Sequence, residues 1–243
     1  MRTLSSQDIL EIYELGEHRN LLDRALMLLA AGCPESGQDE LAELSIGQRD
    51  ALLFALRGLT FGPRLNMFSE CPSCHEQLQF SIDTPELLAD YRIPEESELQ
   101  MKSEGYFVEF RLPNSAALAA TANRSIDEAY QTLLGQCVIR ARQDEMEVTS
   151  SALPETVISA LVSKMLEYDP LSEVVFNLDC PTCGHRWPIV LDIVSFFWAE
   201  LELQVRHLLR EVHILAQAYG WPEGEILTMS AWRRQHYINM VLS

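Results

Sequence analysis

The chain has 243 residues, 47% of them hydrophobic, so it can bury a sizeable core and is not expected to be intrinsically disordered. Asp and Glu number 36 against 18 for Lys and Arg, and the net charge of -18 argues against nucleic acid as a ligand, because a phosphate backbone repels an acidic protein. No apolar run reaches the ~20 residues of a membrane span, and no secretory signal is visible, so we expect a cytoplasmic protein with no membrane span.

Three amphipathic helices are expected in the first part of the chain. The first follows Ser5, a residue type typical of helix N-caps, and the second covers residues 21–29. A polar connection is expected over residues 34–43. Ser45 then opens the third helix, because Gln48 stands three positions later, as a capping box requires.

Strands and helices are both expected in the middle of the chain. Residues 78–82 alternate apolar and polar side chains behind a cysteine-containing turn, as a half-buried strand does. Two strand-like runs, 99–102 and 106–112, flank the turn residues 103–105 and predict a hairpin. Helices are then expected over residues 117–122, 125–140 and 154–168.

The last third of the chain begins with a second cysteine turn between two strand-like runs. Apolar residues over 194–219 then recur every three or four positions and predict one long amphipathic helix that ends at Gly220, followed by a last helix after residue 230. The long helix carries an aromatic stripe that is expected to face the core, the alternative being a docking surface for another subunit. This stripe is Phe196, Phe197 and Trp198.

Four of the six cysteines stand in two Cys-x-x-Cys pairs, a layout that favours a metal site over disulfides. A zinc ion accepts four thiolates tetrahedrally, and each Cys-x-x-Cys turn supplies two of them. Pro72 and Pro181 stiffen the turns, and Gly184 allows a positive φ directly after the second turn. The equivalent position after the first turn is His75. We therefore predict one structural zinc ion, Zn2+, bound by Cys71, Cys74, Cys180 and Cys183.

The two cysteine pairs lie far apart in sequence, because 105 residues separate Cys74 from Cys180. We interpret this interval as a lobe inserted into a zinc ribbon, which leaves the two pairs adjacent in space. Closing such a loop costs only a few kcal/mol, since loop entropy grows logarithmically, whereas structural zinc contributes an apparent ~10 kcal/mol or more. Replacing Cys180 with serine is accordingly expected to prevent folding.

The predicted fold class is α+β and mainly helical. It is a discontinuous zinc ribbon with a long inserted β-hairpin and helical lobe and a long C-terminal helix. The predicted parts are an N-terminal helical region (1–64), the zinc ribbon (65–83 plus 171–193), the inserted lobe (84–170) and the C-terminal helices (194–243).

Other uses of the cysteines stay open. Either pair could be a redox dithiol, although neither has the thioredoxin-like order of strand, turn and helix, and His75 or His185 could replace a cysteine as ligand. Cys33 and Cys137 stand apart from the pairs and are expected to be small apolar residues rather than nucleophiles. Four protein ligands leave no coordination position for water, so the zinc is not expected to catalyse hydrolysis.

No catalytic motif is apparent in the sequence. It lacks the glycine-rich phosphate loops, the nucleophile elbow and the His-Glu-x-x-His signature. Acidic pairs such as Glu95 with Glu96, and Glu200 with Glu202, are expected on solvated faces, because acidic residues abound in this chain. We therefore expect no enzymatic activity and no small-molecule substrate.

A set of short motifs stands in order along the chain from about residue 45 onward. The set comprises Arg49-Asp50-Ala51-Leu52-Leu53 before Phe61-Gly62, the two Cys-Pro-x-Cys turns, Asp169-Pro170, Trp198, Tyr219-Gly220-Trp221-Pro222-Glu223 and Arg233-Arg234-Gln235-His236-Tyr237. In these motifs the chain resembles the baseplate proteins of contractile phage tails and related contractile injection systems, in particular the hub-assembly group labelled baseplate chaperones. The resemblance implies a structural or assembly role, with baseplate or hub proteins of a contractile tail as partners and possible incorporation into the particle.

The alternative function is a zinc-ribbon adaptor in transcription or RNA handling, where such cysteine turns are common. That function requires a basic face beside Arg186 and Trp187, and few cations stand near them in the sequence. The excess of acidic residues indicates solubility, with an acidic docking surface for a basic partner as the second interpretation.

Overall fold

The computed structural model describes residues 1–93, 99–144 and 146–242. Four helices open the chain, and the three predicted ones are confirmed. The prediction of a plain connection over residues 34–43 is wrong at its end, where Asp39 and Glu40 favour the first turn of a short helix through the helix dipole. The helices are α1 (Ser6–Gly16), α2 (Leu21–Gly32), α3 (Gln38–Glu43) and α4 (Ile46–Phe61).

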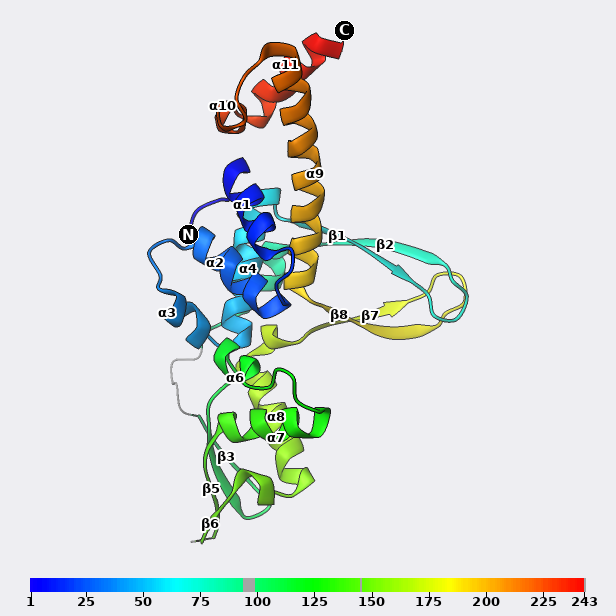
Figure 1. Cartoon of the computed structure of the whole chain (residues 1–243). Helices are drawn as coiled ribbons and strands as arrows, with labels where there is room; N and C mark the ends of the chain where they lie inside the picture. Colours follow the sequence, from blue (N-terminus) through cyan, green and yellow to red (C-terminus); the bar gives the residue numbers. More distant parts are fainter. Residues whose placement is uncertain (94–98, 145, 243) are drawn as a thin grey trace.

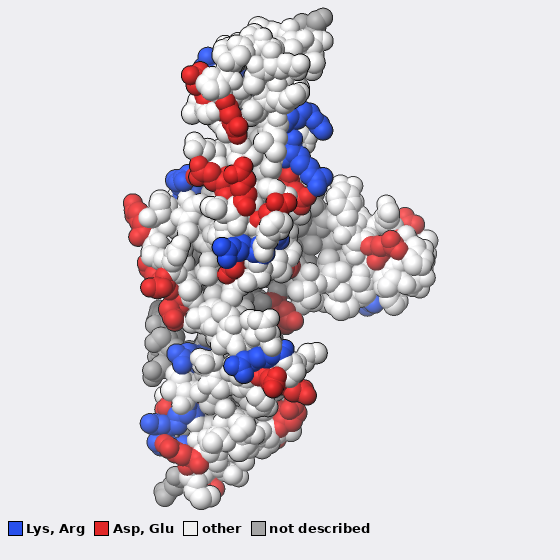
Figure 2. Space-filling model, viewed as in Figure 1, with Lys and Arg blue, Asp and Glu red and all other residues white. Residues whose placement is uncertain are grey.

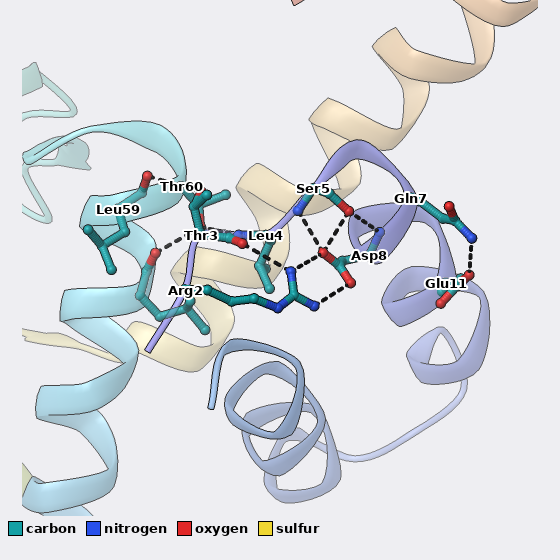
Figure 3. Close-up of polar contacts among 10 residues, drawn as sticks. Arg2, Thr3, Leu4, Ser5, Gln7, Asp8, Glu11, Leu59 and Thr60 are labelled. Carbon is teal, nitrogen blue, oxygen red and sulfur yellow. Dashed lines mark hydrogen bonds and ion pairs between the residues drawn. The ribbon is translucent and has the colours of Figure 1, made fainter. Parts of the chain in front are cut away.

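The N-terminal segment fastens α1 to the end of α4 (Figure 3). Arg2 forms a two-point ion pair with Asp8, with N···O distances of 2.6 and 2.8 Å. Asp8 also completes a capping box with Ser5 at the start of α1. The hydroxyl of Thr3 donates to the carbonyl of Leu59 at 3.2 Å, so the segment before α1 contacts the last turns of α4.

Replacing Asp8 with asparagine is expected to lower the free energy of unfolding by about 1 kcal/mol at neutral pH. The hydrogen bond from Arg2 holds the pKa of the Asp8 carboxyl well below its usual range. A depressed pKa means that the stabilisation is complete above the unfolded pKa of ~3.9 and is lost as the pH falls through the folded value. Urea unfolding at pH 7 and pH 3 should therefore show a difference between wild type and Asp8→Asn that narrows at pH 3, whereas Glu11→Gln on the same helix should change little.

Two β-hairpins lie side by side and project from the helices as an arm, defined as residues 64–83 and 174–191 (Figure 1). In each hairpin, buried or half-buried side chains alternate with exposed ones, so one face packs inward and the other faces solvent. The exposed positions include the apolar residues Phe68, Val175 and Val190. The predicted strand over 78–82 is confirmed, and the strand before the first cysteine turn was not predicted. The strands are β1 (Arg64–Glu70), β2 (Gln77–Asp83), β7 (Val174–Asp179) and β8 (Arg186–Leu191).

The main core joins the N-terminal helices, the base of the arm and the first half of the long helix α9 (Ile193–Tyr219). Phe54 of α4 and Phe197 of α9 are fully buried there, and Trp198 stacks on Tyr13 of α1 at 5.7 Å between ring centroids. The aromatic stripe of α9 therefore lies in the core, as predicted, with Phe196 packed at its edge. The arm contributes Leu65, Met67, Val174 and Leu191 to the same core.

The lobe, defined as residues 99–168, has its own core between a sheet and two helices. The sheet is antiparallel with strand order β3-β4-β5-β6, and its first hairpin is the predicted one, with Glu104 and Gly105 at positive φ in the turn. Its elements are β3 (Leu99–Ser103), β4 (Tyr106–Phe110), α6 (Ser115–Ala119), α7 (Ile126–Cys137), β5 (Val138–Gln143), β6 (Met146–Val148), a 3-10 turn (Ser150–Ala152) and α8 (Glu155–Tyr168). Before the lobe, α5 (Thr84–Leu88) packs on the main core, and after it a 3-10 turn (Pro170–Ser172) leads to β7.

The predicted helix over residues 125–140 is wrong beyond Cys137. There the chain turns into β5 and pairs with β4 in a register that shifts between Glu109 and Phe110. Val138 and Ile139 are β-branched and suit a strand, and the pairing with β4 outweighs the continuation of the helical pattern.

The long helix α9 continues past the main core and carries a C-terminal unit, defined as residues 212–242 (Figure 1). It ends as predicted at Gly220, which caps it with a φ of 69°. The unit closes around a small core of Leu215, Ile226 and Ile238, and the buried Arg234 donates to Glu211 at 2.7 Å. Its other helices are α10 (Glu223–Thr228), which was not predicted, and α11 (Ala231–Leu242).

The described helices include none long and apolar enough to cross a membrane. On the face shown in Figure 2, acidic side chains gather over the N-terminal helices, the lobe carries both acidic and basic side chains, and most of the arm surface is uncharged. Among the predicted acidic pairs, Glu95 and Glu96 lie outside the described residues. Glu200 is not on a solvated face, because it pairs with the buried Arg57 of α4.

Candidate metal centre

The two cysteine turns close the tips of the two hairpins with the same backbone geometry. Glu70 pairs with Gln77 across the first turn, and Asp179 pairs with Arg186 across the second. Each residue of the second pair stands 109 positions after its counterpart in the first. In the first turn the N–H of Cys71 donates to the carbonyl of Glu76 at 2.9 Å, and in the second that of Cys180 donates to His185 at the same distance. The pseudo-repeat therefore extends from the cysteines to the pairing of the strands.

His75 adopts the backbone conformation that Gly184 has in the second turn. Their φ angles are 62° and 71°, and the N–H of each donates to the carbonyl of the first cysteine of its turn at 2.9 Å. A residue with a Cβ is strained in this region. The Nδ1 of His75 lies 2.5 Å from a carboxylate oxygen of Glu70, a contact that favours this position of the ring.

The four predicted cysteines come together between the hairpin tips. Their Sγ atoms all lie within 4.8 Å of one another, and those of Cys71 and Cys183 are 3.7 Å apart, those of Cys74 and Cys180 3.5 Å. Tetrahedral zinc with Zn–S bonds of ~2.3 Å places its sulfurs ~3.8 Å apart. A disulfide requires ~2.05 Å, so the described sulfurs are spaced for a shared cation and not for S–S bonds.

The backbone and the neighbouring thiols shape the electrostatics of the sulfurs. The amide of Cys183, helped by that of Thr182 against the effect of burial, lowers the pKa of the Cys180 thiol to about 7. At Cys74 the amide of Glu76 favours the thiolate, but the thiols of the other three cysteines and burial raise its pKa to about 12. Four thiolates at these distances repel one another, and a bound cation would relieve that repulsion.

The residues considered as alternative ligands or nucleophiles lie apart from this cluster. His185 is exposed and stacks on Trp187 with 6.0 Å between ring centroids, and His75 pairs with Glu70. Cys137 is buried in the lobe, as predicted, and burial raises the pKa of its thiol to about 11. Among the described residues, the four-cysteine cluster is the group of His, Cys, Asp or Glu side chains with the spacing of a metal site.

Comparison with known proteins identifies the family. Residues 3–198 match the model of a family described as T4 bacteriophage base plate protein. The chain belongs to this base plate protein family. The matched range of this base plate protein contains most of the main core, the lobe and both cysteine turns, and it ends within α9. Searches of curated proteins and of solved structures gave no significant match.

The resemblance to baseplate proteins noted in the sequence is thus confirmed. The match supports a structural part in a phage base plate, with other base plate proteins as partners, and gives no support to an adaptor in transcription or RNA handling. Residues 199–243, which include the C-terminal unit, lie outside the matched range.

Substitutions at the two equivalent turn positions of the base plate protein should have unequal effects. Gly184→Ala is expected to destabilise the arm by about 1 kcal/mol, because alanine must adopt a positive φ. His75→Gly relieves the same strain but loses the contact with Glu70, so the net change should be small. Zinc affinity measured by competition with a chromophoric chelator should fall for Gly184→Ala and stay near wild type for His75→Gly; equal losses would show that the two turns do not share one conformation in solution.

Proposed function

We propose that the chain is a non-enzymatic structural or assembly protein of the base plate of a contractile tail or injection system, held in shape by one structural zinc ion. The observation that carries the proposal is the base plate family match over residues 3–198, which includes all four clustered cysteines. Cys71, Cys74, Cys180 and Cys183 would hold the ion.

The donor set favours zinc in a structural role. Four sulfur donors at tetrahedral spacing suit Zn2+ and leave no coordination position for a substrate or for water. Each hairpin contributes two sulfurs, so the ion would join two tips that are 105 residues apart in sequence. This arrangement is a zinc ribbon interrupted by the lobe, and we retain the boundaries 1–64, 65–83 plus 171–193, 84–170 and 194–243 as proposed domains.

The shape of the molecule suits contacts with several partners at once. The arm, the lobe and the C-terminal unit extend in different directions from the main core (Figure 1). Each has its own apolar core or joins the main one, so each can present a fixed surface. We propose baseplate or hub proteins of the tail as these partners, either during assembly or in the finished particle.

The test is removal of the gene from a system that assembles contractile particles. Electron microscopy should show tubes or sheaths without complete base plates, and the affinity-tagged chain should recover base plate proteins when reintroduced. A matched variant with Cys71 and Cys180 replaced by serine should complement less well than Cys33→Ser, which leaves the cluster intact. Normal particles in the deletion strain, together with no recovered tail protein, would rule the proposal out.

A further inference from the structure

An apolar hollow of about 80 Å³ lies on the lobe between α7 and α8. Apart from the Tyr130 hydroxyl and the Cys137 thiol, the side chains that line it are apolar. Tyr130 and Leu133 stand three positions apart and so share one face of α7, and Val162 and Met165 share one face of α8 in the same way. Because Tyr130 and Val162 are exposed, the hollow opens to solvent.

The size and lining of the hollow indicate the kind of side chain that fits it. An apolar cavity of ~150 Å³ accepts a benzene ring, so this open hollow of about 80 Å³ accepts one edge of an aromatic ring. The rest of the ring would then lie over the exposed Tyr130 and Val162. A charged group would find no partner among the apolar lining. We therefore expect an aromatic occupant, and tryptophan is one of the residues that most often anchor protein interfaces.

The C-terminal helix α11 presents such a residue to solvent. Trp232 is 75% exposed, and its ring stacks on His236 with 5.4 Å between ring centroids. The buried residues of α11 are Arg234 and Ile238. Because successive residues of a helix stand ~100° apart, Trp232 lies on the opposite side and faces away from the C-terminal unit. The neighbouring Arg233 is exposed as well, and the sequence of α11 contains no Asp or Glu.

The charges beside the hollow and beside Trp232 are complementary. Burial and the charge of Glu155 raise the pKa of Tyr130, so the exposed carboxylate of Glu155 lies next to the hollow. Two basic side chains of the lobe are already engaged: Arg111 with a backbone carbonyl of α7, and Lys164 with a carboxylate of α8. Among the residues that the structure describes, neither Glu155 nor Arg233 forms an ion pair. A tryptophan edge in the hollow would bring these two opposite charges together.

The hollow and α11 lie at opposite ends of the molecule, with the main core between them (Figure 1). The α11 helix is therefore remote from the lobe of its own chain, and a second copy can supply it. We propose that copies of this chain associate head to tail, with Trp232 of one copy in the hollow of the next and Arg233 paired with Glu155. Such a contact leaves a free hollow at one end and a free α11 at the other, so it continues into chains or closes into a ring.

The contact is small. The 12 residues of α11 span ~18 Å, so the buried area is below that of a stable dimer. We expect a Kd on the order of 10–100 μM, with monomers at about 1 μM and association at several hundred μM. The association goes beyond the proposed base plate function and does not involve the zinc site.

The test is sedimentation velocity of the full chain over about 5–500 μM. The weight-average mass of the wild type should rise past that of a dimer. Trp232→Lys and Val162→Lys should each weaken association about tenfold or more with the melting temperature unchanged, because both positions are exposed. Mixed in equal amounts, they should form a dimer that grows no further, since one variant keeps its hollow and the other keeps its α11. Phe68→Lys is the matched control on the arm and should associate like wild type.

Reversal of the charged pair provides a second test. Arg233→Glu and Glu155→Lys should each weaken association about fivefold, and the double variant should recover most of the loss, because it restores an opposite pair. A merely structural role of either residue would give no recovery.

Four results would overturn the proposal. They are a wild type that stays monomeric at about 500 μM, a wild type that stops at a dimer, a mixture of the two lysine variants that stays monomeric, and an equal loss in Phe68→Lys. Binding of a base plate protein by the hollow without self-association would likewise replace the second copy as its occupant.

Discussion

Replacing Cys180 with serine is expected to lower the zinc content of the purified protein from about one ion per chain to well below one, because a serine hydroxyl is a poor zinc ligand and the remaining three thiolates bind more weakly. Elemental analysis after removal of loosely bound metal measures the change. Cys33→Ser is the matched control, since Cys33 lies outside the cluster.

The structure limits how far the effect of this substitution should spread. The sulfurs lie at the hairpin tips, whereas Leu65, Val174 and Leu191 anchor the bases of the hairpins in the main core. The loss of folding expected from the sequence should therefore be confined to the arm. In Cys180→Ser, amide hydrogen exchange should become fast in the strands of the arm and stay slow in α4 and α9. Wild-type protein that contains no metal, or unchanged zinc content in Cys180→Ser, would contradict the site.

Replacing Arg57 with alanine is expected to lower the free energy of unfolding by about 3–5 kcal/mol. The Arg57 side chain is 3% exposed and joins three elements: its Nε donates to Glu200 of α9 at 2.8 Å, and its Nη1 donates to the carbonyls of Gly62 and Arg64 at 2.7 and 2.8 Å. Alanine would leave a carboxylate and two carbonyl groups without these donors.

Urea unfolding followed by far-ultraviolet circular dichroism measures this loss. Arg64→Ala is the control, because the Arg64 side chain is largely exposed and makes a long contact with Asp83, so its removal should change stability by less than about 0.5 kcal/mol. Glu200→Gln should fall between the two, since it keeps an acceptor for Arg57. A loss for Arg57→Ala no greater than that for Arg64→Ala would show that the buried contacts add no net stability.

Local signals in the sequence predicted most of the helices. Ser5 caps α1, Ser45 and Gln48 form the capping box that their spacing indicates, and Gly220 ends α9. These features depend on residues three or four positions apart, which sequence displays directly. The boundary between α7 and β5 was missed because the pairing of Val138 with Phe110 of β4 decides it, and that pairing joins distant parts of the chain.

Some features of the candidate site and its surroundings could likewise be predicted from the sequence, and others could not. The four cysteines were named from their spacing and residue type, and their proximity is a property of the tertiary structure. The matching register of the two hairpins could have been found from sequence by extending the cysteine alignment to the flanking strands. The pairing of Glu200 with Arg57 could not, because they lie 143 positions apart in the sequence and no local pattern distinguishes that glutamate from its solvated neighbours.

The length of α9 fixes the orientation of the C-terminal unit around the axis of this helix. Its 27 residues span ~40 Å, and its first half is clamped in the main core while its last turns hold α10 and α11. Between Leu208 of the main core and Val212 of the C-terminal core, inserting a single residue would rotate the distal helices by about 100° around the axis of α9. Inserting seven residues would nearly restore their orientation and move them ~10 Å outward. The number of residues in α9 therefore sets both the distance of the C-terminal unit from the main core and its orientation around the helix axis.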